Sequence, residues 1–291
     1  MSLSNNNITN CLSIDVEGFV ESNLQSFNIG KEHINKSAEN IEIEKNVHFM
    51  LGMLDDLGIK ATFFCLGRIA KEIPNVVREI ASNGHEIACH SYEHIRIASD
   101  ENKSEFKDKL LSAKNQLEDV SGKKVYGFRA PDFSITASSL WALDALKEAG
   151  FLYDSSIYPT GLHDVYGIKK TDPFINKLDN GLVEFPLATI ELFGKRFPFG
   201  GGGYFRIYPL FLTKYCISKI NKLGHPCMFY IHPYEVGPII PSILKLSLLR
   251  RFRHYYNTQD GDKRLKKILK GYKFAPVVEV LKQKGLILQK N

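Results

Sequence analysis

Two histidines separated by three residues are the feature of this sequence with the clearest chemical use. His90 and His94 would lie on one side of the chain if the turn between them is helical. Two imidazoles and one carboxylate can hold a divalent metal ion and leave positions open for water and substrate. Glu93 directly precedes the second histidine, so the pattern differs from the HExxH motif of zinc proteases. Surface histidines are the commoner explanation of such a pair, and the surrounding sequence has to decide.

Other ionisable residues occur where short apolar runs end. Asp15 and Glu17 close the run Cys11–Val16, His90 follows Glu86–Cys89, Arg129 follows Val125–Phe128, and His232 follows Cys227–Ile231. These runs alternate with amphipathic segments, which predicts a parallel α/β architecture. In a barrel of parallel strands, the carboxyl ends of the strands form the catalytic face. Several separate segments therefore bring ionisable groups to one rim, and this favours an enzyme.

The elements between these residues are marked by periodicity and by glycines. Apolar residues recur at helical spacing from Val47 to Leu57, and Gly58 ends that helix. The other predicted elements are the strands Ala61–Cys65, Leu152–Tyr153 and Val183–Phe185, and the helices Asn75–Ser82, 103–120, Ser139–Ala149 and Tyr208–Leu223. The loop Gly200–Gly203 lacks the strand–loop–helix context of a phosphate-binding motif. His85 follows a glycine at the start of a strand, and we expect it in the core.

Length and composition are those of a globular protein. The 291 residues are 44% hydrophobic and 24% charged, which excludes a disordered chain, a collagen and a coiled coil. The net charge of +6 is a mild excess, and we interpret it as spread along the chain. Its one modest basic run, Lys263–Lys270, is typical of a solvated helix face. With neither a basic stripe nor a recognition motif, we expect no nucleic-acid partner.

Cysteine usage and the N-terminus favour a cytoplasmic location. The five cysteines are an odd number and form no CxxC pair, which suits free thiols in a reducing compartment. The first ten residues are polar, unlike a signal peptide. No apolar run is long enough to span a membrane.

A set of short motifs follows in order along the chain. They are Ala61-Thr62-Phe63-Phe64, Gly84-His85-Glu86-Ile87, His90-Ser91-x-x-His94, Arg129-Ala130-Pro131, Tyr153-Asp154-Ser155-Ser156 and Tyr230-Ile231-His232-Pro233. Together they resemble the polysaccharide deacetylases of the NodB-homology class, related to carbohydrate esterase family 4. The resemblance covers about Cys11 to Leu281. It looks closest to a branch associated with bacterial exopolysaccharide loci, through Asp15-Val16-Glu17, Gly201–Arg206, Arg251–Asn257 and a C-terminal region like DUF3473.

This resemblance implies a fold and a reaction. The fold would be a distorted (β/α) barrel of about seven parallel strands in a single domain over residues 1–291. Within it, we expect a core over about 11–235 and an extension over about 240–291 packed on the barrel. The reaction would be the metal-dependent hydrolysis of an N-acetyl group on an amino sugar. The metal would be one divalent ion, most simply zinc, with cobalt and nickel as alternatives.

The resemblance also assigns metal ligands. His90 and His94 match the two metal-binding histidines of the family. The family's first motif is usually two adjacent aspartates, a general base and a metal ligand, but the second position here is Val16. Asp15 keeps the position of the base, and Glu17 is the replacement ligand. Asp15 and Glu17 point to the same side if both are in an extended strand. If the strand ends at Asp15, the local turn sets the direction of the Glu17 side chain instead.

The remaining roles follow from the family's mechanism. Arg129 would orient Asp15, His232 would protonate the leaving amine, and a backbone N–H just after Pro131 would hold the oxyanion. Where the family commonly has an aromatic residue after that proline, this chain has Asp132, with Phe133 next. The family also supplies a carboxylate that tunes the acid histidine, and Asp154 and Glu184 are both candidates here.

Three functions remain open from the sequence. The first is removal of an N-acetyl group from an amino sugar in a glycan or a lipid-linked precursor. The second keeps the fold and the metal but changes the acyl group, as in a deformylase or O-deacetylase acting on a glycolipid intermediate. The third is a barrel that binds a glycan without turnover, and Val16 is the feature that favours it. The oligomeric state is left open.

Overall fold

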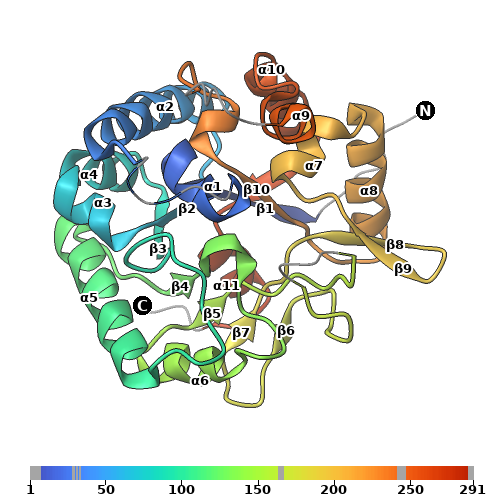
Figure 1. The fold of residues 1–291 in the computed structure, drawn as a ribbon. Helices are drawn as coiled ribbons and strands as arrows, with labels where there is room; N and C mark the ends of the chain where they lie inside the picture. Colours follow the sequence, from blue (N-terminus) through green and yellow to red (C-terminus); the bar gives the residue numbers. More distant parts are fainter. Residues whose placement is uncertain are drawn as a thin grey trace.

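The protein is built around one curled sheet. The computed structural model describes residues 8–27, 30, 32, 34–162, 167–240 and 247–287. The strands of the sheet are β1 (Thr9–Val16), β2 (Thr62–Cys65), β3 (Glu86–Cys89), β4 (Gly127–Phe128), β5 (Tyr153–Asp154), β6 (Asn176–Lys177), β7 (Val183–Glu184), β10 (Met228–Ile231) and β11 (Lys273–Ala275). Their order is β10-β1-β2-β3-β4-β5-β7-β6, with β11 paired to β1 (Figure 1).

The sheet is an incomplete barrel of parallel strands. The seven strands from β10 to β7 run parallel, and β6 pairs antiparallel with β7 at the edge. The sequence-based prediction of a distorted (β/α) barrel with about seven parallel strands is therefore confirmed. Since parallel strands end at the same side, Asp15, His90, Arg129 and His232 are all brought to one rim.

Helices form a layer around the sheet. They are α1 (Phe19–Phe27), α2 (Lys36–Asp56), α3 (Gly67–Glu72), α4 (Pro74–Ser82), α5 (Lys103–Ser121), α6 (Trp141–Glu148), α7 (Gly202–Ile207), α8 (Leu210–Lys222), α9 (Leu248–Tyr255), α10 (Gly261–Leu269) and α11 (Val277–Gln283). Figure 1 shows α2 to α6 curving around one side of the barrel. Within the described ranges, no helix has both the length and the apolar character needed to cross a bilayer.

Strand β1, the neighbour of the terminal strand β10, is buried almost along its whole length. It pairs with β2 on one edge through Ser13–Val16, and with β10 through Cys11–Ile14. Its first residues pair with β11, which comes from the C-terminal part of the chain. Segments more than 200 residues apart in sequence therefore meet at this strand.

The C-terminal segment covers the amino ends of β2 and β3. The backbone N–H of Val277 donates to Thr62 Oγ1 at 2.8 Å, and that of Val278 donates to Glu86 Oε2 at 3.0 Å. Glu86 also accepts from Tyr153 Oη at 2.8 Å. Helix α11 is thus fixed to the strands at the end of the barrel opposite the rim.

Candidate metal centre and active site

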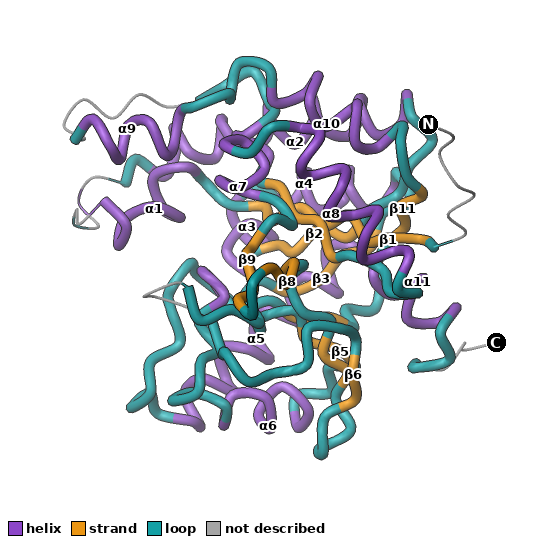
Figure 2. The backbone as a smooth tube through the Cα atoms, turned by 90° about the vertical axis from the view of Figure 1, so that its right-hand side faces the viewer, coloured by secondary structure: helices purple, strands orange, loops and turns teal. Residues whose placement is uncertain are grey.

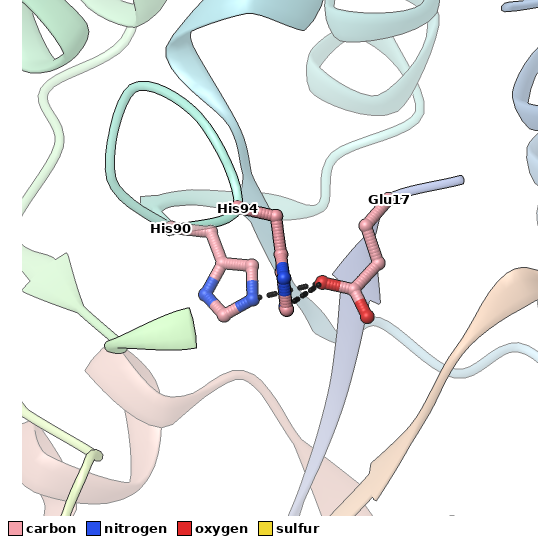
Figure 3. A group of neighbouring side chains, drawn as sticks. All are labelled: Glu17, His90 and His94. Atoms are coloured by element: carbon pink, nitrogen blue, oxygen red, sulfur yellow. Dashed lines mark hydrogen bonds and ion pairs between the residues drawn. The ribbon is translucent and has the colours of Figure 1, made fainter. Parts of the chain in front are cut away.

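Glu17, His90 and His94 converge just beyond the ends of β1 and β3, the strands on either side of β2. Glu17 Oε2 lies 3.1 Å from Nε2 of His90 and 3.1 Å from Nε2 of His94. Figure 3 shows both imidazoles directed at that one carboxylate oxygen. The three potential ligand atoms all lie within 4.8 Å of one another. These residues form a candidate metal site, with the carboxylate supplied by Glu17.

The loop that carries the two histidines is not helical. It follows β3 as a series of bends, and Ser91 has a positive φ of 70°. The carbonyl of Ser91 accepts from the backbone N–H of Gly67 at 2.9 Å, at the start of α3. The helical turn that would have placed His90 and His94 on one side of the chain is therefore not what brings them together. A left-handed residue, held in place by the start of a neighbouring helix, brings the imidazoles together instead.

The donor set suits a divalent transition metal. Nδ1 of His90 lies 2.7 Å from the carbonyl oxygen of Arg129, which leaves Nε2 to face the site. Three ligands, two imidazoles and a carboxylate, leave further positions for water and substrate. Burial alone would raise the pKa of Glu17, but the neighbouring histidines hold it well below its usual range. Burial lowers the pKa of His94, yet Glu17 raises it to about 9, so this pocket attracts positive charge.

Arg129 binds Asp15, two residues before Glu17. Its Nη1 donates to Asp15 Oδ1 at 2.6 Å and to Ser13 Oγ at 2.8 Å. Its other nitrogens donate to the carbonyl and hydroxyl of Ser155, at 3.2 and 3.0 Å. The guanidinium is fully buried and lies 4.1 Å from the ring centroid of Phe64. The geometry thus fixes the orientation of the Asp15 carboxylate.

His232 also contacts Glu17 of the candidate metal site. Its Nε2 lies 3.2 Å from Glu17 Oε1, and its Nδ1 lies 2.9 Å from Glu235 Oε2. Glu235 is buried, and its other oxygen accepts from Arg206 Nε at 2.7 Å. Burial opposes the charge of Glu235, but Arg206 and His232 lower its pKa to about 2.

The carboxylate beside His232 is therefore neither of the two that the sequence suggested. The expectation that Asp154 or Glu184 contacts His232 is wrong, because both carboxylates bind residues just after β5 instead. Asp154 Oδ1 accepts from Ser156 Oγ at 2.6 Å, and Ser156 Oγ accepts from the N–H of Ala130 at 2.8 Å. Glu184 Oε1 accepts from the N–H of Ile157 at 3.2 Å. Burial, followed by the charge of Asp154, raises the pKa of Glu184 well above its usual range.

The turn Pro131–Phe133 contains two residues with left-handed backbone. Asp132 and Phe133 each have a φ of 52°, which is costly for side chains that carry a Cβ. Asp132 Oδ2 forms an ion pair with Arg96 Nε at 2.7 Å at the partly exposed rim. Phe133 is buried, with its ring centroid 5.0 Å from that of Tyr230. Of the two, Asp132 is the one that reaches the surface.

Buried carboxylates fix the start of helix α1, which follows Glu17. Glu39 Oε1 accepts from the N–H of Glu21 at 2.7 Å, and Glu42 Oε1 accepts from the N–H of Phe19 at 3.1 Å. Burial raises the pKa of Glu39 to about 7 and that of Glu42 to about 8. Both carboxylates come from α2 and satisfy N–H groups that have no partner within the helix.

The glycines of the loop before α7 allow a close backbone approach. A Cβ on Gly201 would lie 1.8 Å from the carbonyl oxygen of Tyr230 in β10, and Gly201 has a φ of 136°. A Cβ on Gly200 would lie 2.7 Å from the carbonyl oxygen of Met228. The loop packs against a strand, which accounts for its glycines without a phosphate ligand.

Residues outside the site behave as the sequence predicts. His85 is buried, and its Nδ1 accepts from the N–H of Ala61 at 3.1 Å. Burial lowers the pKa of His85 to about 4, so it is a neutral core histidine. All five cysteines are buried free thiols.

Two family models match consecutive parts of the chain. The polysaccharide deacetylase model matches residues 27–153, and the domain of unknown function DUF3473 matches residues 155–282. The first match contains His90 and His94, and the second contains Arg206, His232 and Glu235. Glu17 and Asp15 lie before both.

Curated relatives align over part of the chain. A peptidoglycan-N-acetylglucosamine deacetylase from Bacillus cereus is 33% identical over 96 residues, covering 33% of this chain and 34% of that protein. A chitooligosaccharide deacetylase from Azorhizobium caulinodans is 39% identical over 72 residues, covering 24% and 34%. The match thus spans about a third of each relative's length.

Solved structures share the fold over nearly the whole chain. A crystal structure of a protein assigned as a polysaccharide deacetylase from Mycobacterium smegmatis has a TM-score of 0.64 at 19% identity, covering 97% of this chain and 94% of that one. The allantoinase PuuE has a TM-score of 0.61 at 15% identity, covering 97% and 91%. At these identities the likeness concerns the fold.

Proposed function

We propose that this chain, a NodB-type polysaccharide deacetylase domain joined to a DUF3473 region, hydrolyses an N-acetyl group on an amino sugar with the help of one divalent metal ion. The observation that carries the proposal is the convergence of Glu17, His90 and His94. Asp15, two residues before Glu17, is held by Arg129, and His232, whose Nε2 lies 3.2 Å from Glu17 Oε1, is held by Glu235. A base, an acid and a set of metal ligands are what amide hydrolysis requires.

Each side chain has a task in this proposal. Glu17, His90 and His94 would hold the metal, which when bound would polarise the amide carbonyl and acidify water. Asp15 accepts the proton of the attacking water, and Arg129 keeps the carboxylate in the orientation needed. His232 donates a proton from Nε2 to the leaving amine, while Glu235 holds Nδ1–H. The N–H of Asp132 would donate to the oxyanion.

The names of the relatives support a substrate class. One curated relative named above is a peptidoglycan-N-acetylglucosamine deacetylase, and the other is a chitooligosaccharide deacetylase. We propose an acetylated amino sugar within a bacterial glycan or a lipid-linked precursor, with zinc, cobalt or nickel as the metal. A cytoplasmic location would favour the precursor.

The proposal is tested by metal analysis together with acetate release. Wild-type protein should contain about one divalent metal ion per chain and release acetate from N-acetylated oligosaccharides. The double variant His90→Ala/His94→Ala should lose both. The variant His48→Ala, at an exposed position on α2, should keep both.

Other outcomes decide between the remaining functions. Metal binding with release of formate, or of acetate only from O-acetylated glycolipids, would replace the N-acetyl substrate by the second candidate. Glycan binding without any release, in metal-loaded protein, would favour a binding barrel. The same metal content in wild type and the double variant would refute the ligand assignment itself.

A further inference from the structure

Positive charge is concentrated in one stretch of the chain, residues 192–259. The stretch contains ten Lys and Arg residues and a single carboxylate, Glu235, whereas the whole chain has a net charge of only +6. Glu235 is buried and paired with Arg206. The excess charge is therefore not spread along the chain, as the total alone suggested. The remainder of the sequence is slightly acidic.

Exposed apolar side chains are concentrated in the same stretch. Of the thirteen large apolar side chains that are exposed among the described residues, eight lie between residues 192 and 259. Apolar exposure together with unbalanced positive charge is the combination found on surfaces that meet anionic membranes.

Helix α9 carries the most prominent of these side chains. Leu248, Phe252 and Tyr256 are 87%, 50% and 41% exposed and recur every four residues, so they form one line along the helix. The N–H of Tyr256 donates to the carbonyl of Phe252 at 3.0 Å, so the helical turn continues to the third residue. We name these three residues the α9 ridge. Arg251, which is also exposed, lies next to it in sequence.

The other side of α9 is attached to the rim of the candidate active site. His254 packs against Phe27 with ring centroids 4.7 Å apart, and Tyr255 packs against Phe19 at 5.4 Å. Phe19 comes two residues after Glu17. Figure 2 shows α9 and α1 side by side at the left edge of the molecule, beyond the ends of the strands. The helix is therefore held on its inner side, and the ridge is left without a partner among the described residues.

We propose that the α9 ridge inserts into the headgroup region of a membrane that contains anionic lipid. The basic stretch 192–259 supplies the long-range attraction, and the ridge supplies apolar contact. Charge alone would suit any polyanion, but a leucine and two aromatic rings on the exposed line suit a lipid surface better than a polar polymer. Together with the proposed deacetylase activity, this docking would hold the active-site rim close to glycans at a membrane.

Vesicle co-sedimentation of the whole chain tests the docking without any measurement of activity. The protein should bind vesicles of equimolar phosphatidylcholine and phosphatidylglycerol, and bind pure phosphatidylcholine at least tenfold more weakly. Leu248→Ser/Phe252→Ser should weaken binding to the mixed vesicles by about tenfold or more. Arg251→Glu should also weaken it by about tenfold, and added salt should weaken it further.

Matched controls distinguish docking by the α9 ridge from nonspecific hydrophobic adsorption and from unfolding. Ile41→Ser/Leu140→Ser removes two exposed apolar side chains elsewhere and should leave vesicle binding unchanged. Every variant should keep the wild-type circular dichroism spectrum and Tm within a few degrees. Absence of wild-type binding to anionic vesicles, or equal loss in the control pair, would overturn the proposal. So would a concentration-dependent dimer that Leu248→Ser/Phe252→Ser dissolves, because the ridge would then bind a second copy of the chain.

Discussion

The Nδ1 atom of His232 lies 2.9 Å from Oε2 of Glu235, three residues further along the chain. The same oxygen accepts from the backbone N–H of His232 at 3.0 Å, so the glutamate caps the short turn Pro233–Glu235 as well. Arg206 binds its other oxygen. One buried carboxylate thus fixes the turn, orients the imidazole and connects it to a guanidinium from α7.

We predict that Glu235→Gln lowers kcat by about tenfold or more with little change in metal content. Glutamine keeps the shape of the side chain but removes the charge that raises the pKa of His232. If His232 acts as the acid, the basic limb of kcat/KM should move to lower pH, because the acid would lose its proton sooner. The measurement is a pH–rate profile with metal analysis. Glu191→Gln, at an exposed position, is the control, and an unshifted profile would remove Glu235 from the proposed chain of contacts.

Substitutions of Asp15 and of Glu17 should affect turnover and metal binding separately. Glu17→Gln should weaken metal binding by about 10- to 100-fold, because it neutralises the carboxylate facing both imidazoles. Asp15→Asn should keep the metal and lower kcat by about 100-fold or more. Metal titration followed by acetate release measures both. The reverse pattern would make Asp15 the ligand.

Stability should fall with rising pH because of Glu42. Burial raises its pKa to about 8 in the folded protein, against 4.5 in an unfolded chain, so the folded state binds the proton more tightly. The stabilisation is fully present below pH 4.5 and is lost as the pH rises through about 8. The difference in free energy of unfolding between Glu42→Gln and wild type should therefore shift in favour of the variant by about 1–3 kcal/mol from pH 4.5 to pH 8.5.

Urea unfolding at these two pH values measures the effect of Glu42→Gln. Glu44→Gln, an exposed position on the same helix, should show no such difference. A gain of the same size at both pH values would mean that ionisation of Glu42 is not its cause.

Gly201→Ala should destabilise the protein by about 2–4 kcal/mol. The added Cβ would collide with the carbonyl of Tyr230, and its φ of 136° disfavours any residue with a side chain. Gly203→Ala is the matched control, since its Cβ would meet only the end of Arg206 at 3.6 Å. Thermal unfolding of both variants checks this. Equal Tm values would show that the loop can move away from β10.

Much of the strand framework could be predicted from the sequence. Glu86–Cys89 is predicted with its exact bounds, and the strands around Asp15, Arg129 and His232 are correct within two residues. Buried apolar runs followed by one ionisable residue are a strong local signal, because the carboxyl ends of parallel strands must meet at one rim. That signal predicts a shared rim, whereas the grouping of Glu17 with His90 and His94 as metal ligands was implied by the family resemblance.

The partners of His232 could not be predicted with the same ease. Arg206 and Glu235 meet only because α7 packs against the turn after β10, and no local sequence pattern predicts that contact. A signal for Glu235 was present, since a glutamate three residues after a capping position commonly reaches back to it. The single-domain organisation and the cytoplasmic location remain predictions.

The position of β1 between β2 and the C-terminal strands β10 and β11 has a consequence for how the chain folds. Glu17, His90 and His94 are available once about a third of the chain has been synthesised, but β1 meets β10 only when residues 228–231 emerge. Until then one edge of a buried, apolar strand lacks its neighbour, and contacts so distant in sequence make folding slow. We therefore expect the nascent chain to depend on protection of that edge until synthesis is nearly complete.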